Sequence, residues 1–452
     1  TNQEAEEFSI LDANDGGFGF SEDQGNSWEQ ISKGYLTTQF YGVAKKPGSH
    51  EYIGGMQDNG TWQSPIGKIA KAESEYESRV EGDGFECLWH PVYPHRILAS
   101  SYYNTFRVSN DGGETWSSAT DGILRGGPFI TRLSNSPENP DLVFAVGDRG
   151  VYRHPNFCIG RYEWELSEIG DAWAIDGEVT SSHNVEVSLA DESIVWAGAG
   201  IHEDPDLSVF VSTDYGETFE EVSHYGEWEM GYLTSIATHP SEPETAFLLF
   251  SLNGRPKILR TEDLGETWED ITQFSKSDST SQNGFPDVMV YSLLVFPYNH
   301  DIIWAGTEIG IFESPDNGET WHYANTGLPA VSVWQMIIQD NTLVLATHGR
   351  GIWTAPQYPG AVNDDELDER IELVVFPNPS EGVVRLTMES PESGELRIAI
   401  YDLKGQTVYE DMAIKNPGVF SDILNMDHLP PGSYILSAVI RSDTFTSRFV
   451  LQ

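Results

Sequence analysis

Three observations predict that the chain is all-β and built from repeated four-stranded units. The 452 residues are rich in strand formers, with 19 Tyr, 21 Phe and 13 Trp, and in turn formers, with 43 Gly and 24 Pro. One eight-residue turn motif occurs five times, and related segments extend the repeat across the first 357 residues. The repeat length of about four dozen residues suits four short strands joined by tight turns.

The charge balance excludes one class of partner. The chain has 71 acidic and 25 basic residues, for a formal net charge of −46. Such a surface repels phosphate backbones, so we expect no nucleic-acid partner. We interpret the excess of acid as a solvated surface rather than as a groove for cations.

Cysteine content and hydropathy narrow the kinds of protein that the chain can be and where it can be located. The two cysteines, Cys87 and Cys158, are too few for a disulfide scaffold, and the sequence leaves open a single bridge or two buried thiols. No apolar run approaches the roughly 18 residues of a membrane span. The first residues lack the basic and apolar regions of a signal peptide. The chain is therefore either cytoplasmic or begins after the start of its gene product.

The repeated motif has the pattern S/T-x-D-x-G-x-T/S-W/F, which is typical of a hairpin turn. Its Asp can accept hydrogen bonds from N–H groups of its own loop, and its Gly can adopt the positive φ that other residues resist. The aromatic residue can then cover the turn. We predict a structural role for the five motif aspartates, Asp23, Asp111, Asp214, Asp263 and Asp316.

The spacing of the repeat predicts the architecture. Segments that begin at Gly60, Gly150 and Gly351 keep the frame but lack the motif Asp, and with them the spacings run from 41 to 58 residues. This period predicts a β-propeller of about seven to eight four-stranded blades over residues 1–357. The second strand of most units is small and apolar, as in Ile53-Gly-Gly, and we predict that it is the inner strand beside the channel.

The two ends of the repeat region do not match. The first unit begins at its second strand, at Phe8, and the last unit stops after its third strand, at Trp353. We expect the chain to be the C-terminal part of a longer precursor. The preceding sequence would supply the missing strand or a whole earlier propeller.

The repeats resemble the Asp-box (BNR-repeat) propellers, which include sortilin-type domains, xyloglucanase-type glycoside hydrolases and sialidases. The resemblance covers roughly residues 8–357 and implies the fold without a particular function, because the box lies at the blade periphery in these families. The sialidase chemistry is not favoured, since the chain lacks the Arg-Ile-Pro motif of that family.

The remainder of the chain predicts a second module. Residues 358–372 form an acidic linker, and alternating strands in residues 373–452 predict a small Ig-like β-sandwich. Three motifs occur in order in this module: Phe376-Pro-Asn-Pro379 with Gly382, Ile400–Gly405 and Leu429–Tyr434. With these motifs the module resembles the type A sorting domain of Bacteroidota type IX secretion, which implies export through the outer membrane and the secretion machinery as a partner. The tail lacks the terminal lysines common in that family.

Polar segments next to the strands supply the candidate site, because propeller ligands bind where loops converge at the channel mouth. Asp58 and Asp83 are candidate acid and base of a glycoside hydrolase, which needs two carboxylates at a defined separation. Tight turns at Asp58-Asn59-Gly60 and Gly82-Asp83-Gly84 are the alternative. The candidate ligand-binding residues are Gln57, Asn59, His348 and Arg350.

No cofactor and no metal site are expected. The segment Asp12–Gly17 has some features of a calcium loop, but carboxylates at alternate positions do not continue beyond it. We interpret it as a turn, with calcium as the alternative.

The sequence leaves three functions open. The first, which we prefer, is a noncatalytic secreted or cell-surface module that binds polysaccharide or protein. The second is a secreted glycoside hydrolase of the xyloglucanase type, and the third is a self-assembling envelope or filament component. The binding module predicts a continuous face of exposed aromatic residues, whereas the hydrolase predicts that Asp58 and Asp83 meet across one open groove.

Overall fold

The computed structural model divides the chain into two compact units, Thr1–Gln339 with Leu343–Pro356, and Asp340–Thr342 with Gln357–Gln452. The expected linker at 358–372 lies outside the described residues. Those residues are 8–14, 17–31, 37–72, 74–124, 126–170, 172–174, 178–201, 207–222, 230–275, 279–324, 326–357, 373–376, 380, 382–390, 392–402, 406–416, 418–426, 428–441 and 443–451.

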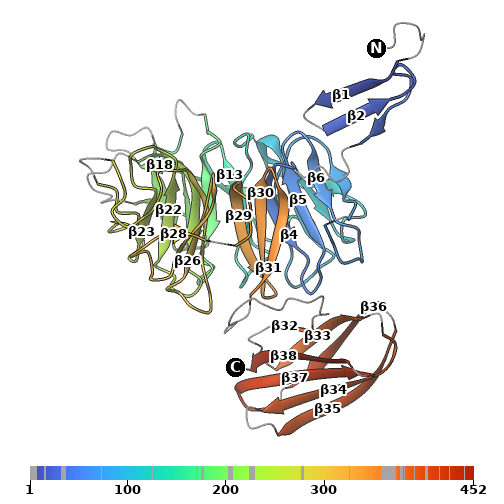
Figure 1. Ribbon diagram of the computed structural model, residues 1–452. Coiled ribbons are helices and arrows are strands. Elements are labelled where there is room, and N and C mark those ends of the chain that lie inside the picture. Colours follow the sequence, from blue (N-terminus) through green and yellow to red (C-terminus); the bar gives the residue numbers. More distant parts are fainter. Residues whose placement is uncertain are drawn as a thin grey trace. The chain divides into compact units, whose positions relative to one another are not determined.

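In the first unit, seven antiparallel sheets form the blades of a propeller within the described residues (Figure 1). The first strand of each sheet contacts the first strand of the next, and the last of these, β29, contacts β4 of the first blade, so the ring is closed. The prediction of an all-β propeller is therefore confirmed. Blades 1 to 3 comprise β4 (Phe40–Lys45), β5 (Tyr52–Met56), β6 (Gly60–Gln63) and β7 (Glu77–Val80); β8 (Gly84–Trp89), β9 (Ile97–Ser101), β10 (Thr105–Ser109) and β11 (Ser117–Ser118); and β12 (Leu133–Asn135), β13 (Val143–Gly147), β14 (Gly150–His154) and β15 (Glu165–Glu168).

The later blades depart from four strands in two places. Blade 5 gains a short strand, β18, beside β21, and blade 7 has three strands among the described residues. The short 3₁₀ turn η1 (Tyr102–Asn104) joins β9 to β10 in blade 2. Blades 4 to 7 comprise β16 (Asn184–Val187), β17 (Val195–Gly198), β19 (Val209–Ser212) and β20 (Glu220–Glu221); β21 (Gly231–Thr238), β22 (Ala246–Phe250), β23 (Ile258–Thr261) and β24 (Glu269–Asp270) with β18 (Gly200–Ile201); β25 (Val290–Val295), β26 (Ile303–Thr307), β27 (Gly310–Ser314) and β28 (His322–Tyr323); and β29 (Ser332–Gln339), β30 (Thr342–His348) and β31 (Gly351–Pro356).

The inner strand was predicted wrongly. The first strand of each blade is innermost, because these strands make the successive contacts around the ring, whereas the small, apolar strand is the second. The small residues serve packing between blades. A Cβ added to Gly55 on β5 would lie 2.1 Å from the carbonyl oxygen of Phe85 on the next blade.

The repeated turn motif holds the third and fourth strands of a blade together. In blade 2, Asp111 Oδ1 accepts hydrogen bonds from the Thr115 N–H at 2.9 Å and the Ser109 hydroxyl at 2.8 Å. Hydrogen bonds from the Thr115 side chain and backbone lower the pKa of Asp111 to about 2. The motif glycine Gly113 adopts a φ of 102° and packs against Gln63 of the preceding blade. In blades 2, 4, 5 and 6 the motif turn therefore both closes a hairpin and contacts the preceding blade.

A separate three-stranded sheet precedes blade 1 and contains the first copy of the motif. It comprises β1 (Ile10–Asn14), β2 (Gly17–Ser21) and β3 (Glu29–Gln30). Its motif glycine, Gly25, lies near Ile10 and Trp28 of the same sheet. Trp28 is 51% exposed, whereas the equivalent Trp321 in blade 6 is 4% exposed.

The second unit is a sandwich of two antiparallel sheets. Side chains from both sheets form one core, with Leu386, Leu396 and Leu436 fully buried. One sheet has the order β32-β33-β36 and the other β35-β34-β37-β38. The strands are β32 (Leu373–Phe376), β33 (Val383–Ser390), β34 (Gly394–Asp402), β35 (Thr407–Lys415), β36 (Gly418–Asn425), β37 (Gly432–Ile440) and β38 (Asp443–Leu451).

Candidate functional site

The alternation of strand directions assigns the candidate residues to one face of the propeller. The first and third strands of a blade begin at the face where the second strand ends, because neighbouring strands are antiparallel. Gln57 and Asp58 follow β5, Asp83 precedes β8 and His348 ends β30, so all four lie on this face, which we term the mouth face. The motif aspartates of the blades follow third strands and therefore lie on the opposite face; they are Asp111, Asp214, Asp263 and Asp316.

Asp58 and Asp83 lie next to each other, but the contact between them is that of a turn. The Asp58 backbone N–H donates to Asp83 Oδ1 at 2.8 Å, and Asp58 adopts a φ of 59°. Ser101 Oγ donates to the backbone carbonyl of Asp83 at 2.7 Å. One carboxylate oxygen of Asp83 therefore fixes the Asp58-Asn59-Gly60 turn, and both aspartates line the same hollow.

Gln57 and His348 meet at Tyr41 of the inner strand β4. The Tyr41 hydroxyl donates to Gln57 Oε1 at 2.8 Å, and the rings of Tyr41 and His348 have centroids 5.1 Å apart. Burial lowers the pKa of His348, so its ring is neutral at pH 7. Arg350 lies in the following turn with an exposed side chain, and Asn59 Nδ2 donates to the Gln57 carbonyl at 3.0 Å.

A row of ring side chains runs along the mouth face from blade 6 through blades 7, 1 and 2 to the segment before blade 3. Trp334 stacks on Tyr291 with centroids 4.7 Å apart and on His348 at 5.0 Å. Tyr41 lies 4.7 Å from Trp334 and 4.9 Å from Phe85. The row continues through Phe129 to Tyr102 and Tyr103, with centroids 5.6 to 6.3 Å apart. The aromatic row thus comprises Tyr291, Trp334, His348, Tyr41, Phe85, Phe129, Tyr102 and Tyr103.

Irregular pairing of the inner strands places part of this row. The ladder between β4 and β5 shifts register between Phe40 and Gly42, so Tyr41 has no ladder partner. The ladder between β25 and β26 shifts in the same way around Tyr291. A bulge turns a side chain away from the regular alternation, and bulges are common beside functional sites.

A hollow of about 590 Å³ adjoins the aromatic row. Tyr102 belongs to both features, and β1 contributes Asn14 to the wall. The lining residues are Asn14, Asp58, Asn59, Ser78, Glu81, Gly82, Asp83 and Tyr102.

A charged cluster joins the inner strands of blades 2, 3 and 4. Arg132 is 8% exposed and its Nη1 lies 3.0 Å from Glu86 Oε1. Burial and the nearby charge of Glu86 raise the pKa of Glu186 to about 8, although a hydrogen bond with Ser134 and the charge of Arg132 oppose the shift. Glu186 is therefore largely protonated at neutral pH, and the cluster carries one carboxylate against one guanidinium.

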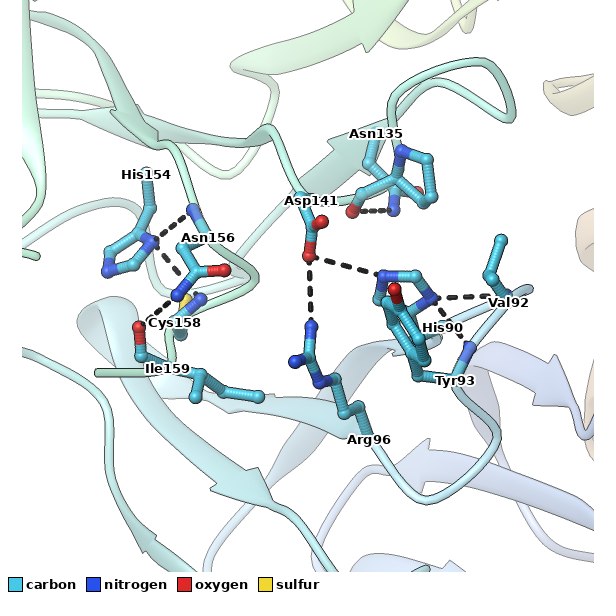
Figure 2. Close-up of polar contacts among 11 residues, drawn as sticks. His90, Val92, Tyr93, Arg96, Asn135, Asp141, His154, Asn156, Cys158 and Ile159 are labelled. Carbon is cyan, nitrogen blue, oxygen red and sulfur yellow. Dashed lines mark hydrogen bonds and ion pairs between the residues drawn. The ribbon is translucent and has the colours of Figure 1, made fainter.

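A histidine–aspartate pair on the opposite face lacks the geometry of a catalytic dyad (Figure 2). His90 Nδ1 accepts the N–H groups of Val92 and Tyr93, each at 3.1 Å. The proton therefore lies on Nε2, which donates to Asp141 Oδ1 at 3.2 Å, and Arg96 contacts the same oxygen. The lone pair of Nδ1 is thus already engaged by two backbone N–H groups, and Nε2 bears the proton, so neither ring nitrogen is available as a base. The pair therefore joins blades 2 and 3 structurally.

His239, Glu242 and His300 place potential metal-ligand atoms within 4.8 Å of one another. The Nδ1 atom of His239 accepts the N–H groups of Ser241 at 3.3 Å and Glu242 at 3.0 Å. The ring therefore carries its proton on Nε2, and a metal there would require an imidazolate. This hydrogen bonding does not fit a metal site.

The two cysteines are free and buried. Burial raises the pKa of Cys87 to about 12, so its thiol stays protonated and unreactive near neutral pH. The chain thus holds two buried thiols, which is one of the two alternatives that the sequence left open.

The sequence analysis missed the aromatic row and the Glu86–Arg132–Glu186 cluster. A signal for part of the row was available, since Tyr41, Phe85, Tyr291 and Trp334 lie near the start of the first strand in four units. Aromatic residues are also ordinary strand formers, and Tyr41 and Phe85 are buried, so their position alone did not distinguish ligand-binding residues from core residues.

Residues 374–452 match the family model described as the secretion system C-terminal sorting domain. No curated protein matches the chain. A GH74 enzyme from Niastella koreensis has a TM-score of 0.49 and 14% identity, covering 76% of this chain and 47% of its own. YCF48 from Cyanidioschyzon merolae has a TM-score of 0.49 and 10% identity, covering 71% of this chain and 96% of its own.

The GH74 xyloglucanase from Xanthomonas campestris gives similar values, with a TM-score of 0.47 and 15% identity over 75% of this chain and 47% of its own. The chain therefore spans about half the length of these GH74 enzymes.

No helix among the described residues meets the length and apolarity of a membrane span. The sorting domain supports export to the cell surface or secretion. From the closed ring of blades and the matched family model, the chain is a β-propeller protein that carries a type IX secretion sorting domain in its C-terminal part.

Proposed function

We propose that the protein is a secreted or cell-surface module of the Asp-box propeller class that binds polysaccharide on its mouth face. In this proposal residues 1–357 bind the ligand, and residues 373–452 direct export by a Bacteroidota type IX system. The observation that carries the proposal is the exposed end of the aromatic row, since polysaccharide binding requires accessible aromatic rings. The middle of the row, Tyr41 and Phe85, is buried, at 7% and 0% exposed, and supports this end from below.

The exposed end of the row has the chemistry of a sugar-binding platform. Tyr102, Tyr103 and Phe129 are 40%, 56% and 40% exposed, and the rings of Tyr102 and Phe129 lie nearly parallel, at 7°. Flat apolar rings can pack against the C–H faces of pyranose rings, while polar groups nearby pair with hydroxyls. Asn59 and Ser78 supply such groups in the adjoining hollow.

The double substitution of Tyr102 and Phe129 by alanine should weaken polysaccharide binding about tenfold, since each aromatic contact contributes about 0.5–1.5 kcal/mol. Affinity electrophoresis of the full chain in gels that contain xyloglucan, mixed-linkage glucan or chitosan measures the effect. Tyr215→Ala is the matched control, because Tyr215 is 45% exposed and lies in a motif turn on the opposite face. Equal retardation of the control and the double variant would rule out the aromatic row as the binding surface.

A glycoside hydrolase is the second candidate, because Asp58 and Asp83 line the same hollow. The hydrogen bond from Asp58 N–H to Asp83 Oδ1 supports the turn as the alternative role. Proton transfer would then use the Asp58 carboxylate and the second oxygen of Asp83.

Asp58→Asn and Asp83→Asn separate these roles. Asparagine retains an oxygen that can accept the Asp58 N–H, so the turn should persist in Asp83→Asn while any acid–base chemistry is lost. For a binding module we expect no reducing ends to be released from polysaccharide by the wild-type chain or by either variant. Release by the wild type that falls at least a hundredfold in both variants would instead establish the hydrolase.

A further inference from the structure

The hollow beside the aromatic row is strongly acidic. Asp58, Glu81 and Asp83 are among its eight lining residues, and none of the described lining residues carries a positive charge. Glu81 is exposed and Asp83 is half-buried. Burial is the largest cause of the raised pKa of Tyr41, and the negative charges of Asp83 and Asp58 raise this pKa further. The electric field of the two carboxylates therefore reaches the aromatic row.

This arrangement discriminates among sugars by charge. A uronic or sialic acid would bring a carboxylate towards three carboxylates, which is unfavourable. A neutral sugar would gain hydrogen bonds without a charge term. A protonated amino group would gain attraction to Glu81 and Asp83 and a cation–π contact with the Tyr102 ring, which lines the same hollow.

Resting on the proposed function, we infer that the hollow binds an amine-bearing sugar, such as a glucosamine unit of a polysaccharide, in preference to neutral and acidic sugars. Tyr102 joins the two parts of the site. Its ring continues the stacking surface of the row and places the sugar beside the carboxylates. A basic peptide would share the charge but not the requirement for a flat ring face.

The test uses isothermal titration of the full chain with three trisaccharides, made of glucosamine, N-acetylglucosamine or galacturonic acid. The glucosamine and N-acetylglucosamine trisaccharides differ mainly by the acetyl groups, which remove the positive charge of the amines. We expect glucosamine trisaccharide to bind at least tenfold more tightly than its acetylated form and galacturonate trisaccharide not to bind. The combined Glu81→Gln and Asp83→Asn variant should reduce the preference to less than twofold, and Tyr102→Ala should weaken both glucosamine ligands.

A net charge of −46 attracts any cation, so a charge-matched control is needed. Glu114→Gln with Glu266→Gln removes the same charge from exposed residues of the motif turns on the opposite face. An equal loss of preference in this control would reduce the effect to general attraction and overturn the inference.

The remaining outcomes distinguish a failure of this inference from a failure of the proposed function. Equal affinity for the charged and acetylated trisaccharides overturns the inference and leaves the proposed function standing. Absence of binding to every trisaccharide and to the polysaccharide gels overturns both. Trilysine that binds as tightly as the glucosamine trisaccharide, depends on Glu81 and Asp83 and is unaffected by Tyr102→Ala would assign the hollow to a basic peptide instead.

Discussion

Gly55→Ala is expected to lower the free energy of unfolding of the propeller unit by at least about 3 kcal/mol. The added Cβ would lie 2.1 Å from the Phe85 carbonyl oxygen and 2.3 Å from its nitrogen, and both atoms belong to the backbone of the next blade. No rotamer change can relieve such a contact. To relieve the clash, blades 1 and 2 would have to move apart at strands β5 and β8. This movement would also remove the packing between the two blades.

Urea unfolding followed by tryptophan fluorescence isolates this effect, because all 13 tryptophans precede residue 357. Gly170→Ala is the matched control, since an added Cβ there has no heavy atom within 4 Å and the residue is exposed. We expect it to be neutral or slightly stabilising. Gly42→Ala, with its nearest contact at 2.9 Å, should be intermediate. A Gly55→Ala midpoint within error of the Gly170→Ala midpoint would contradict the close approach of the blades.

The fold was predictable because its determinants are local. The turn motif closes its hydrogen bonds within four residues, as from Thr115 to Asp111, so the pattern survives in the sequence and marks blades 2, 4, 5 and 6. The identity of the innermost strand was not predictable in this way. The small residues of β5 are required by Phe85, which lies thirty residues further along the chain and on another blade.

The candidate site was predictable only in part. Gln57, Asp58, Asp83 and His348 were found because polar residues at strand ends stand out from apolar strands, and the structure places them on one face. Tyr41 and Tyr291 were missed because a register shift between strands, which no local pattern shows, turns them towards the mouth. The charge state of Glu186 depends on Glu86, Arg132 and Ser134, which come from two other places in the sequence.

Glu186→Gln should remove a loss of stability that the wild-type protein suffers between pH 6 and pH 9. The pKa of Glu186 is about 8 in the folded protein, against 4.5 for an unperturbed glutamate, because of burial and then the charge of Glu86. Between these two values the folded state holds a proton that the unfolded chain has released. The free energy of unfolding therefore falls as pH rises, and the loss is complete once the pH exceeds the folded pKa.

Each pH unit in that window corresponds to about 1.4 kcal/mol for a fully shifted group, and partial solvent access reduces the total to about 2 kcal/mol between pH 6 and pH 9. The measurement is urea unfolding of the wild type and Glu186→Gln at both pH values, in which the titrations common to both proteins cancel. Glu114→Gln, which alters an exposed glutamate in a motif turn, should retain the wild-type slope. Parallel wild-type and Glu186→Gln profiles would mean that Glu186 is ionised at neutral pH, and Arg132 would then face two carboxylates instead of one.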